Sequence, residues 1–201
     1  MDAPEKITLP LFPLGTVLFP RGRLPLKIFE QRYLEMTKRC IADDAPFGVC
    51  LIRDGAEVGQ PALTFDVGCT ARIRHWDLPT PGLFHLVTEG ERRFRVLSRA
   101  VEKSGLLRAE VELLPEQAPR PLAPEHALAA DVLRQVAQQL GEEAFAPPLD
   151  FDDAAWAGCR LAEVLPLTLP SRQRLLEMTT AEERLEALMP VLRRLTAGAP
   201  V

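Results

Sequence analysis

The sequence PEQAPRPLAP at residues 115–124 separates two parts of the chain that have different patterns. Four of these ten residues are proline, which lacks the backbone N–H that helices and sheets use, so an extended linker is expected. Short β-like runs precede this segment, and helical periodicity follows it. We therefore predict an α+β protein with two subdomains, a β-rich one over residues 1–118 and a helical one over residues 119–201.

Upstream of the linker, glycine and proline turns separate short runs of strand-forming residues. Residues 106–114 alternate between apolar and charged side chains, which predicts a half-buried antiparallel strand. The other predicted strands cover residues 7–12, 17–19, 24–28, 47–52, 67–75, 83–89 and 92–97. One helix is expected among them, from about Glu30 to Ala42, with Tyr33 on its buried face and Arg32 on its solvated face.

Downstream of the linker, the first expected helix is marked by apolar residues at a spacing of four. These residues are Leu128, Val132, Val136 and Leu140. His126 is expected on its solvated face, and Gly141 is expected to end it.

Two capping signals mark later helices. Asp152 or Asp153 can cap a helix that runs to Leu165. A capping box, Thr180 with Glu183, opens the last helix. Pro190 is expected to kink this helix, and its inward face contains Leu185 and Leu192.

The overall composition is that of a soluble globular chain. It has 201 residues, of which 47% are hydrophobic and 26% charged, and its formal net charge is −4. There is no apolar run of eighteen residues, and the N-terminal MDAPEKITLP is too polar for a signal peptide. We expect a cytoplasmic protein that neither spans a membrane nor offers a basic surface to nucleic acid.

The cysteines are expected to be structural. Cys40, Cys50, Cys69 and Cys159 form no Cys-x-x-Cys motif, and none is placed with histidine at zinc-ligand spacing. We expect reduced, buried thiols, no metal and no cofactor.

Motifs for catalysis are missing from the sequence. No glycine precedes a lysine, as a Walker A loop requires, and no serine lies in Gly-x-Ser-x-Gly. Three alternatives stay open but are disfavoured: a nucleophilic Cys69 assisted by His75 or His85, convergence of the histidines on a metal, and a phosphate-binding arginine cluster at residues 92–99. A solvated strand face is the favoured interpretation of that cluster.

The segment PLFPLGTVLFPRGRLPLKIFEQRYLEM at residues 10–36 resembles the N-terminal, substrate-binding domain of the Lon protease family. The resemblance continues in order through residues 46–52, 67–73, 83–96, 107–114 and 165–192. It is closest to a free-standing bacterial form, without ATPase or peptidase modules. It implies a PUA-like antiparallel β pseudo-barrel with one inserted helix, followed by a C-terminal helical bundle. It also implies a tight turn at Gly90, between the strands 83–89 and 92–97.

The resemblance further implies a non-enzymatic module that binds exposed or unfolded protein segments. The candidate peptide-binding residues are Phe29, Glu30, Gln31, Arg32 and Trp76. Phe29 and Trp76 are expected to give apolar contact, and residues 30–32 polar contact. An ATP-dependent protease is a further candidate partner. The alternatives are a small-molecule-sensing or RNA-binding PUA-like domain.

Overall fold

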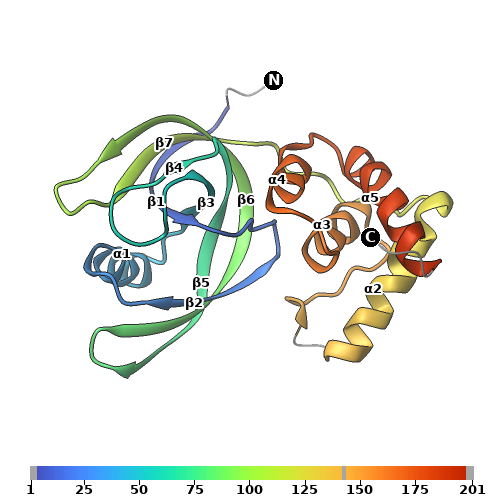
Figure 1. Cartoon of the computed structure of the whole chain (residues 1–201), viewed down its shortest axis with the longest axis horizontal. Helices are drawn as coiled ribbons and strands as arrows, with labels where there is room; N and C mark the ends of the chain where they lie inside the picture. The colour runs from blue at the N-terminus through green and yellow to red at the C-terminus, as the bar shows by residue number, and fades with distance from the viewer. Residues whose placement is uncertain (1–3, 142–143, 198–201) are drawn as a thin grey trace. The chain divides into compact units, whose positions relative to one another are not determined.

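A computed structural model describes residues 4–141 and 144–197 of the chain (Figure 1). The chain divides into two compact units, Met1–Pro115 and Glu116–Val201. The division falls within the proline-rich segment. The strands and helix α1 belong to the first unit, and the remaining helices belong to the second.

The first unit is built from seven strands and one helix among its described residues. These are β1 (Lys6–Leu14), β2 (Arg23–Ile28), α1 (Gln31–Ala42), β3 (Phe47–Asp54), β4 (Leu63–Thr64), β5 (Val67–Thr80), β6 (Leu83–Val101) and β7 (Leu107–Leu113). The apolar residues of β7, at 107, 109, 111 and 113, are all buried, which confirms the alternation seen in the sequence.

The sheet closes on itself. Its strands are hydrogen-bonded in the order β1-β7-β6-β5-β3-β4, and a parallel pairing that sets Leu11 opposite Gly48 joins β1 to β3. β2 lies off this ring and pairs with the first half of β6. The predicted fold class, a mainly antiparallel barrel with one inserted helix and a helical region after it, is confirmed.

The predicted turn at Gly90 is wrong, because β6 runs from Leu83 to Val101 without a break. Gly90 serves instead as a point of close backbone approach. Its N–H donates to the carbonyl of Gly22 at 2.9 Å, and a Cβ at position 90 would lie 2.2 Å from the carbonyl oxygen of Phe19. The predicted strand at residues 17–19 is also wrong: these residues are buried but have no regular secondary structure.

Two apolar clusters fill the first unit. One lies between α1 and the sheet and includes Tyr33 and Met36, whereas the other includes Leu11, Phe94 and Val111. Tyr33 is 4% exposed, so its predicted place on the buried face of α1 is confirmed.

The second unit contains a short 3-10 helix and four α-helices among its described residues. These are η1 (Pro124–His126), α2 (Ala127–Leu140), α3 (Ala154–Val164), α4 (Leu169–Glu177) and α5 (Ala181–Thr196). Sequence patterns had not indicated α4, which begins at a Thr168 cap whose hydroxyl accepts a hydrogen bond from the Ser171 N–H. None of the helices in the described ranges combines the length and apolar composition that a membrane span requires.

The predicted helix is present as α2 and ends before Gly141, but the four regularly spaced apolar residues are not the ones that it buries most deeply. Leu140 is 68% exposed, and the residues that α2 buries are Ala129, Ala130, Leu133 and Ala137. A spacing of four drifts by about 40° at each step around a helix with 3.6 residues per turn, so such a stripe leaves the packed face within a few turns. His126 is buried as well, contrary to the solvated position expected for it.

The capping signals of the second unit are confirmed. The Asp153 side chain accepts a hydrogen bond from the Trp156 N–H, and Thr180 with Glu183 forms the complete capping box of α5. Leu185 and Leu192 are fully buried, as predicted for the inward face of α5. The helix continues past Pro190 to Thr196.

The proline-rich segment is bound to the second unit along its length. Gln117 donates to the carbonyl of Thr179 at 2.8 Å and accepts from the Nη1 of Arg184 at 2.8 Å. The Arg120 N–H donates to the Asp153 carboxylate at 2.8 Å. Residues after Pro115 therefore pack as part of the second unit rather than as a free linker.

Candidate peptide-binding site

The five candidate residues lie at two places in the first unit that β6 connects. Phe29 directly follows β2, Glu30 occupies the N-cap position of α1, and Gln31 and Arg32 open that helix, whereas Trp76 lies in β5. β6 pairs with both strands: Ile28 lies opposite Phe84, and Trp76 lies opposite Leu86. The candidates therefore flank one three-stranded ribbon, β2-β6-β5.

Large apolar side chains are exposed at this end of the ribbon. Phe29 is 59% exposed and Trp76 is 47% exposed. The indole of Trp76 meets the ring of Phe84 edge-on, with 5.8 Å between the ring centroids. Because Phe84 pairs with Ile28, the residue before Phe29, both exposed aromatic residues belong to the same end of the ribbon.

Leu78 is a further exposed residue that the sequence analysis missed. It is 46% exposed and follows Trp76 by two positions in β5, close to the turn that joins β5 to β6. The alternation of apolar residues at 76 and 78 was the available signal. We call Phe29, Trp76 and Leu78 the distal apolar surface.

Arg32 is not available to a ligand, and the expectation that it is solvated is wrong. Its side chain is 7% exposed and forms an ion pair with Glu30 at 2.9 Å. Its Nη1 donates to the carbonyl of Gly105 at 3.2 Å, and its guanidinium lies 4.6 Å from the ring centroid of Tyr33. Arg32 thus fastens the start of α1 to the β6–β7 connection.

Gln31 remains exposed at the first turn of α1. Its Nε2 donates to Glu35 at 3.0 Å, an interaction one helical turn along the surface. Among the polar candidates, Gln31 therefore offers an accessible amide, while Glu30 is held by its ion pair with Arg32.

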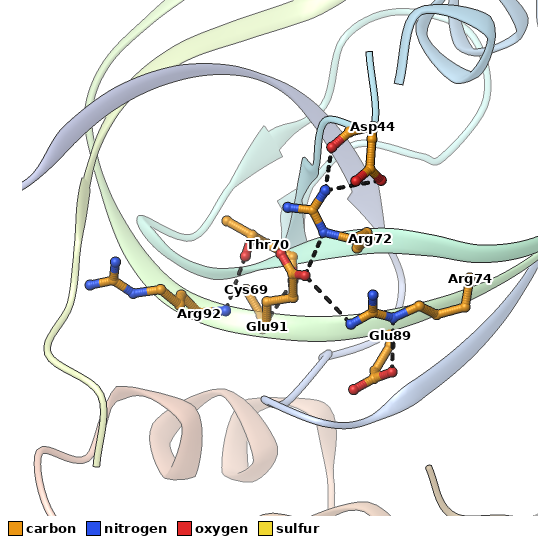
Figure 2. A network of polar contacts seen from close by, with 8 residues as sticks. All are labelled: Asp44, Cys69, Thr70, Arg72, Arg74, Glu89, Glu91 and Arg92. Carbon is orange, nitrogen blue, oxygen red and sulfur yellow. Dashed lines mark hydrogen bonds and ion pairs between the residues drawn. The ribbon is translucent and has the colours of Figure 1, made fainter. Parts of the chain in front are cut away.

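An ion-pair network covers part of β5 and β6 (Figure 2). Arg72 contacts Glu91 at 2.6 Å and also Asp44, and Arg74 contacts Glu89 at 3.0 Å. The hydrogen bond from Arg72 to Glu91 raises the pKa of the guanidinium. These arginines are thus paired across neighbouring strands rather than free to bind an anion.

The arginine cluster at residues 92–99 is also largely neutralised. Arg92 pairs with Glu5 at 2.6 Å, and Arg99 pairs with Asp66 at 2.6 Å. Arg93 is 6% exposed, so the solvated face expected for this cluster is wrong at that position. An RNA-binding surface gains no support from this arrangement.

The pairing of β5 with β6 and the burial of the thiols describe the positions of the histidines and cysteines. His75 lies opposite Val87 and His85 lies opposite Asp77, so the two histidines are not cross-strand partners. All four cysteines are free and buried, and burial raises the pKa of the Cys50 thiol to about 12. Within residues 4–141 and 144–197, no three His, Cys, Asp or Glu side chains form a metal-binding group.

This fold is that of Lon N-terminal domains. The crystal structure of a Lon N-terminal domain protein from Xanthomonas campestris matches with a TM-score of 0.77 and 37% sequence identity, over 92% of this chain and 98% of that chain. The N-terminal domain of Mycobacterium avium complex Lon protease matches with a TM-score of 0.65 at 18% identity, over 93% of this chain and 98% of that chain. The second match supports the fold alone.

The chain belongs to the family described as the ATP-dependent protease La (LON) substrate-binding domain, whose model matches residues 8–194. Lon protease 1 of Sorangium cellulosum (strain So ce56) is 32% identical over 200 residues, which is 92% of this chain and 24% of that protein. Lon protease of Anaeromyxobacter dehalogenans (strain 2CP-C) is 26% identical over 195 residues, or 92% of this chain and 23% of that protein. The chain spans about a quarter of the length of the curated relatives that it matches.

Proposed function

We propose that this chain is a non-catalytic protein-binding module that takes up exposed, extended segments of client proteins at the distal apolar surface. The observation that carries the proposal is the exposure of Phe29, Trp76 and Leu78, each between 46% and 59%, at one end of the β2-β6-β5 ribbon. The family description, a substrate-binding domain, supports the same function.

The chemistry of this surface suits an unfolded client. Unfolded segments present apolar side chains that a folded protein would bury, and contact with Phe29 and Trp76 removes those side chains from water. Gln31, which is exposed beside Phe29, can hydrogen-bond to the client backbone. An ATP-dependent protease is the partner that we propose for such a module, since the matched relatives are named Lon proteases.

A titration with a reduced, alkylated protein that stays unfolded in native buffer tests this function. Fluorescence anisotropy should give a dissociation constant of about micromolar or weaker, because the ordering of the client opposes binding. The native form of the same client should bind more weakly. Phe29→Ala and Trp76→Ala should each weaken binding by about 1–2 kcal/mol.

Val101→Ala is the matched control. Val101 is an apolar residue with the same 59% exposure as Phe29, but it lies at the opposite end of β6. This variant should bind like the parent, and all variants should keep the parent melting temperature. Absence of binding by the parent would contradict the proposed function. An equal change in affinity for Phe29→Ala, Trp76→Ala and Val101→Ala would contradict the proposed site.

A further inference from the structure

A pocket of about 210 Å³ lies beside α1 in the first unit, which also contains the candidate peptide-binding site. This volume corresponds to about seven water molecules, enough for a small organic molecule. Its apolar wall includes Ile7, Met36 and Leu106, and its charged residues are Arg39, Asp43 and Arg108. Met36 and Leu106 also belong to the apolar cluster under α1, so the pocket opens directly onto the core.

One border of the pocket is an edge of β1 that no strand among the described residues pairs with. The Leu113 N–H donates to the Glu5 carbonyl at 2.8 Å, which sets the alternation of the antiparallel β1–β7 ladder. By this alternation the backbone of Thr8 faces away from β7, and the pairing of β1 with β3 begins only at Leu11. The N–H and carbonyl of Thr8 are thus available at the pocket, which Thr8 lines.

The charges of α1 that line the pocket are opposite in sign but not paired. Arg39 and Asp43 are four residues apart on α1 and its cap, yet among the described residues no ion pair joins them. A cation placed N-terminal to an anion is the less favourable order for such a pair. Arg108 is held by Glu102 at 2.6 Å.

Two of these charges affect the pKa of the Cys40 thiol. The pKa of Cys40 is raised to about 11, mainly by burial and also by Asp43, while Arg108 acts to lower it. Cys40 lines the pocket as well, together with Asp43 and Arg108. The carboxylate of Asp43 and the guanidinium of Arg108 therefore both influence the part of the wall that Cys40 forms. The pocket therefore combines an apolar wall with nearby charges of both signs.

We propose that this pocket binds a free α-amino acid with an apolar side chain of about the size of leucine. Its carboxylate would be bound by Arg39, which lines the pocket. Its ammonium group would lie near Asp43, at the C-terminal end of α1, where the helix dipole favours a cation. Its side chain would contact Met36 and Leu106, and the backbone of Thr8 supplies a further hydrogen-bonding group.

The proposal is tested with L-leucine and two analogues that each lack one charge. 4-Methylpentanoate lacks the ammonium group, and 3-methylbutylamine lacks the carboxylate. Titrations followed by ¹H–¹⁵N NMR should show that L-leucine shifts the amide signals of Thr8, Asp43 and Ala45, which border the pocket. Each analogue should bind at least five-fold more weakly than L-leucine.

Two pocket variants and one control locate the site. Arg39→Gln and Asp43→Asn should each weaken L-leucine binding at least five-fold. Lys38→Gln, on the same helix but outside the pocket lining, should leave it unchanged. The analogue comparison uses the parent protein, so it stands even if a variant is unstable. The proposal is overturned if 20 mM L-leucine shifts none of these signals, or if 4-methylpentanoate binds as tightly as L-leucine.

Discussion

The backbone of Gly90 passes so close to Phe19 that no side chain fits between them. A Cβ at position 90 would lie 2.2 Å from the Phe19 carbonyl oxygen. Next to this contact, the N–H of Arg21 donates to the carbonyl of Gly90 at 2.6 Å, and the N–H of Gly90 donates to Gly22. Gly90 thereby holds the irregular segment before β2 against the middle of the longest strand.

Gly90→Ala should therefore destabilise the protein by about 2–4 kcal/mol, because the backbone must move to admit the methyl group. Gly15→Ala is the control: the contact there is with the end of the exposed Glu57 side chain, at 3.0 Å, and the free energy of unfolding should fall by less than about 1 kcal/mol. Urea denaturation measures both. Equal stability of the two variants would show that the close approach at Gly90 is not a constraint.

Arg32 should matter for stability. Arg32→Met removes the ion pair with Glu30 and the hydrogen bond to Gly105, and it leaves both partners without their donor. We expect a loss of about 1–3 kcal/mol in the free energy of unfolding. Gln31→Ala, at the exposed neighbouring position, should change it by less than about 0.5 kcal/mol. An Arg32→Met protein as stable as the parent would disprove the structural role.

The inward face of α5 should tolerate no charge. Leu185 and Leu192 are 0% and 1% exposed, so Leu185→Asp or Leu192→Asp would bury an unpaired carboxylate. Each should cost several kcal/mol, about 3–5, in thermal or urea unfolding. Leu140→Asp makes the same change at a leucine that is 68% exposed and should be nearly neutral. Unchanged melting temperatures for both α5 variants would refute the assigned face.

Glu163 should make the stability depend on pH near neutrality. Burial raises its pKa to about 7, although Arg160, at 2.9 Å, opposes the rise. A carboxyl whose pKa is higher in the folded than in the unfolded protein stabilises the fold most at pH values below its unfolded pKa. That contribution is lost as the pH rises through about 7.

The free energy of unfolding should thus decrease between pH 5 and 8, and Glu163→Gln should flatten this part of the profile. Glu186→Gln, an exposed carboxyl on α5, serves as the control and should keep the parent slope. Parallel profiles for the parent and Glu163→Gln would contradict the prediction.

The thiols should be unreactive in the folded protein. Burial raises the pKa of Cys40 to about 11 and that of Cys50 to about 12, so little thiolate exists at pH 8. Iodoacetamide should label these cysteines only after denaturation, and added reductant should not change the melting temperature. Fast labelling of the native protein, or a disulfide found by mass spectrometry, would be inconsistent with the buried, free thiols of this structure.

Patterns confined to a few neighbouring residues were predictable from the sequence. The alternation in β7 follows from the two-residue period of a strand, and the Asp153 cap and the capping box at Thr180 and Glu183 depend on contacts at the start of one helix. The ordered motifs from residue 10 to residue 192 also indicated the family, which the match over residues 8–194 confirms.

The tertiary structure alone decided features that depend on partners far away in the chain. A glycine between two strand-like runs resembles a turn, and only the approach of Phe19 shows why Gly90 lies within a strand. Likewise, an arginine at the start of an amphipathic helix appears solvated until Gly105 and Tyr33 enclose it. The exposed aromatic residues of the candidate site could be selected from sequence, whereas their place on one ribbon end required the pairing of β2 and β5 with β6. Local periodicity determines secondary structure, but long-range packing determines which side chains water can reach.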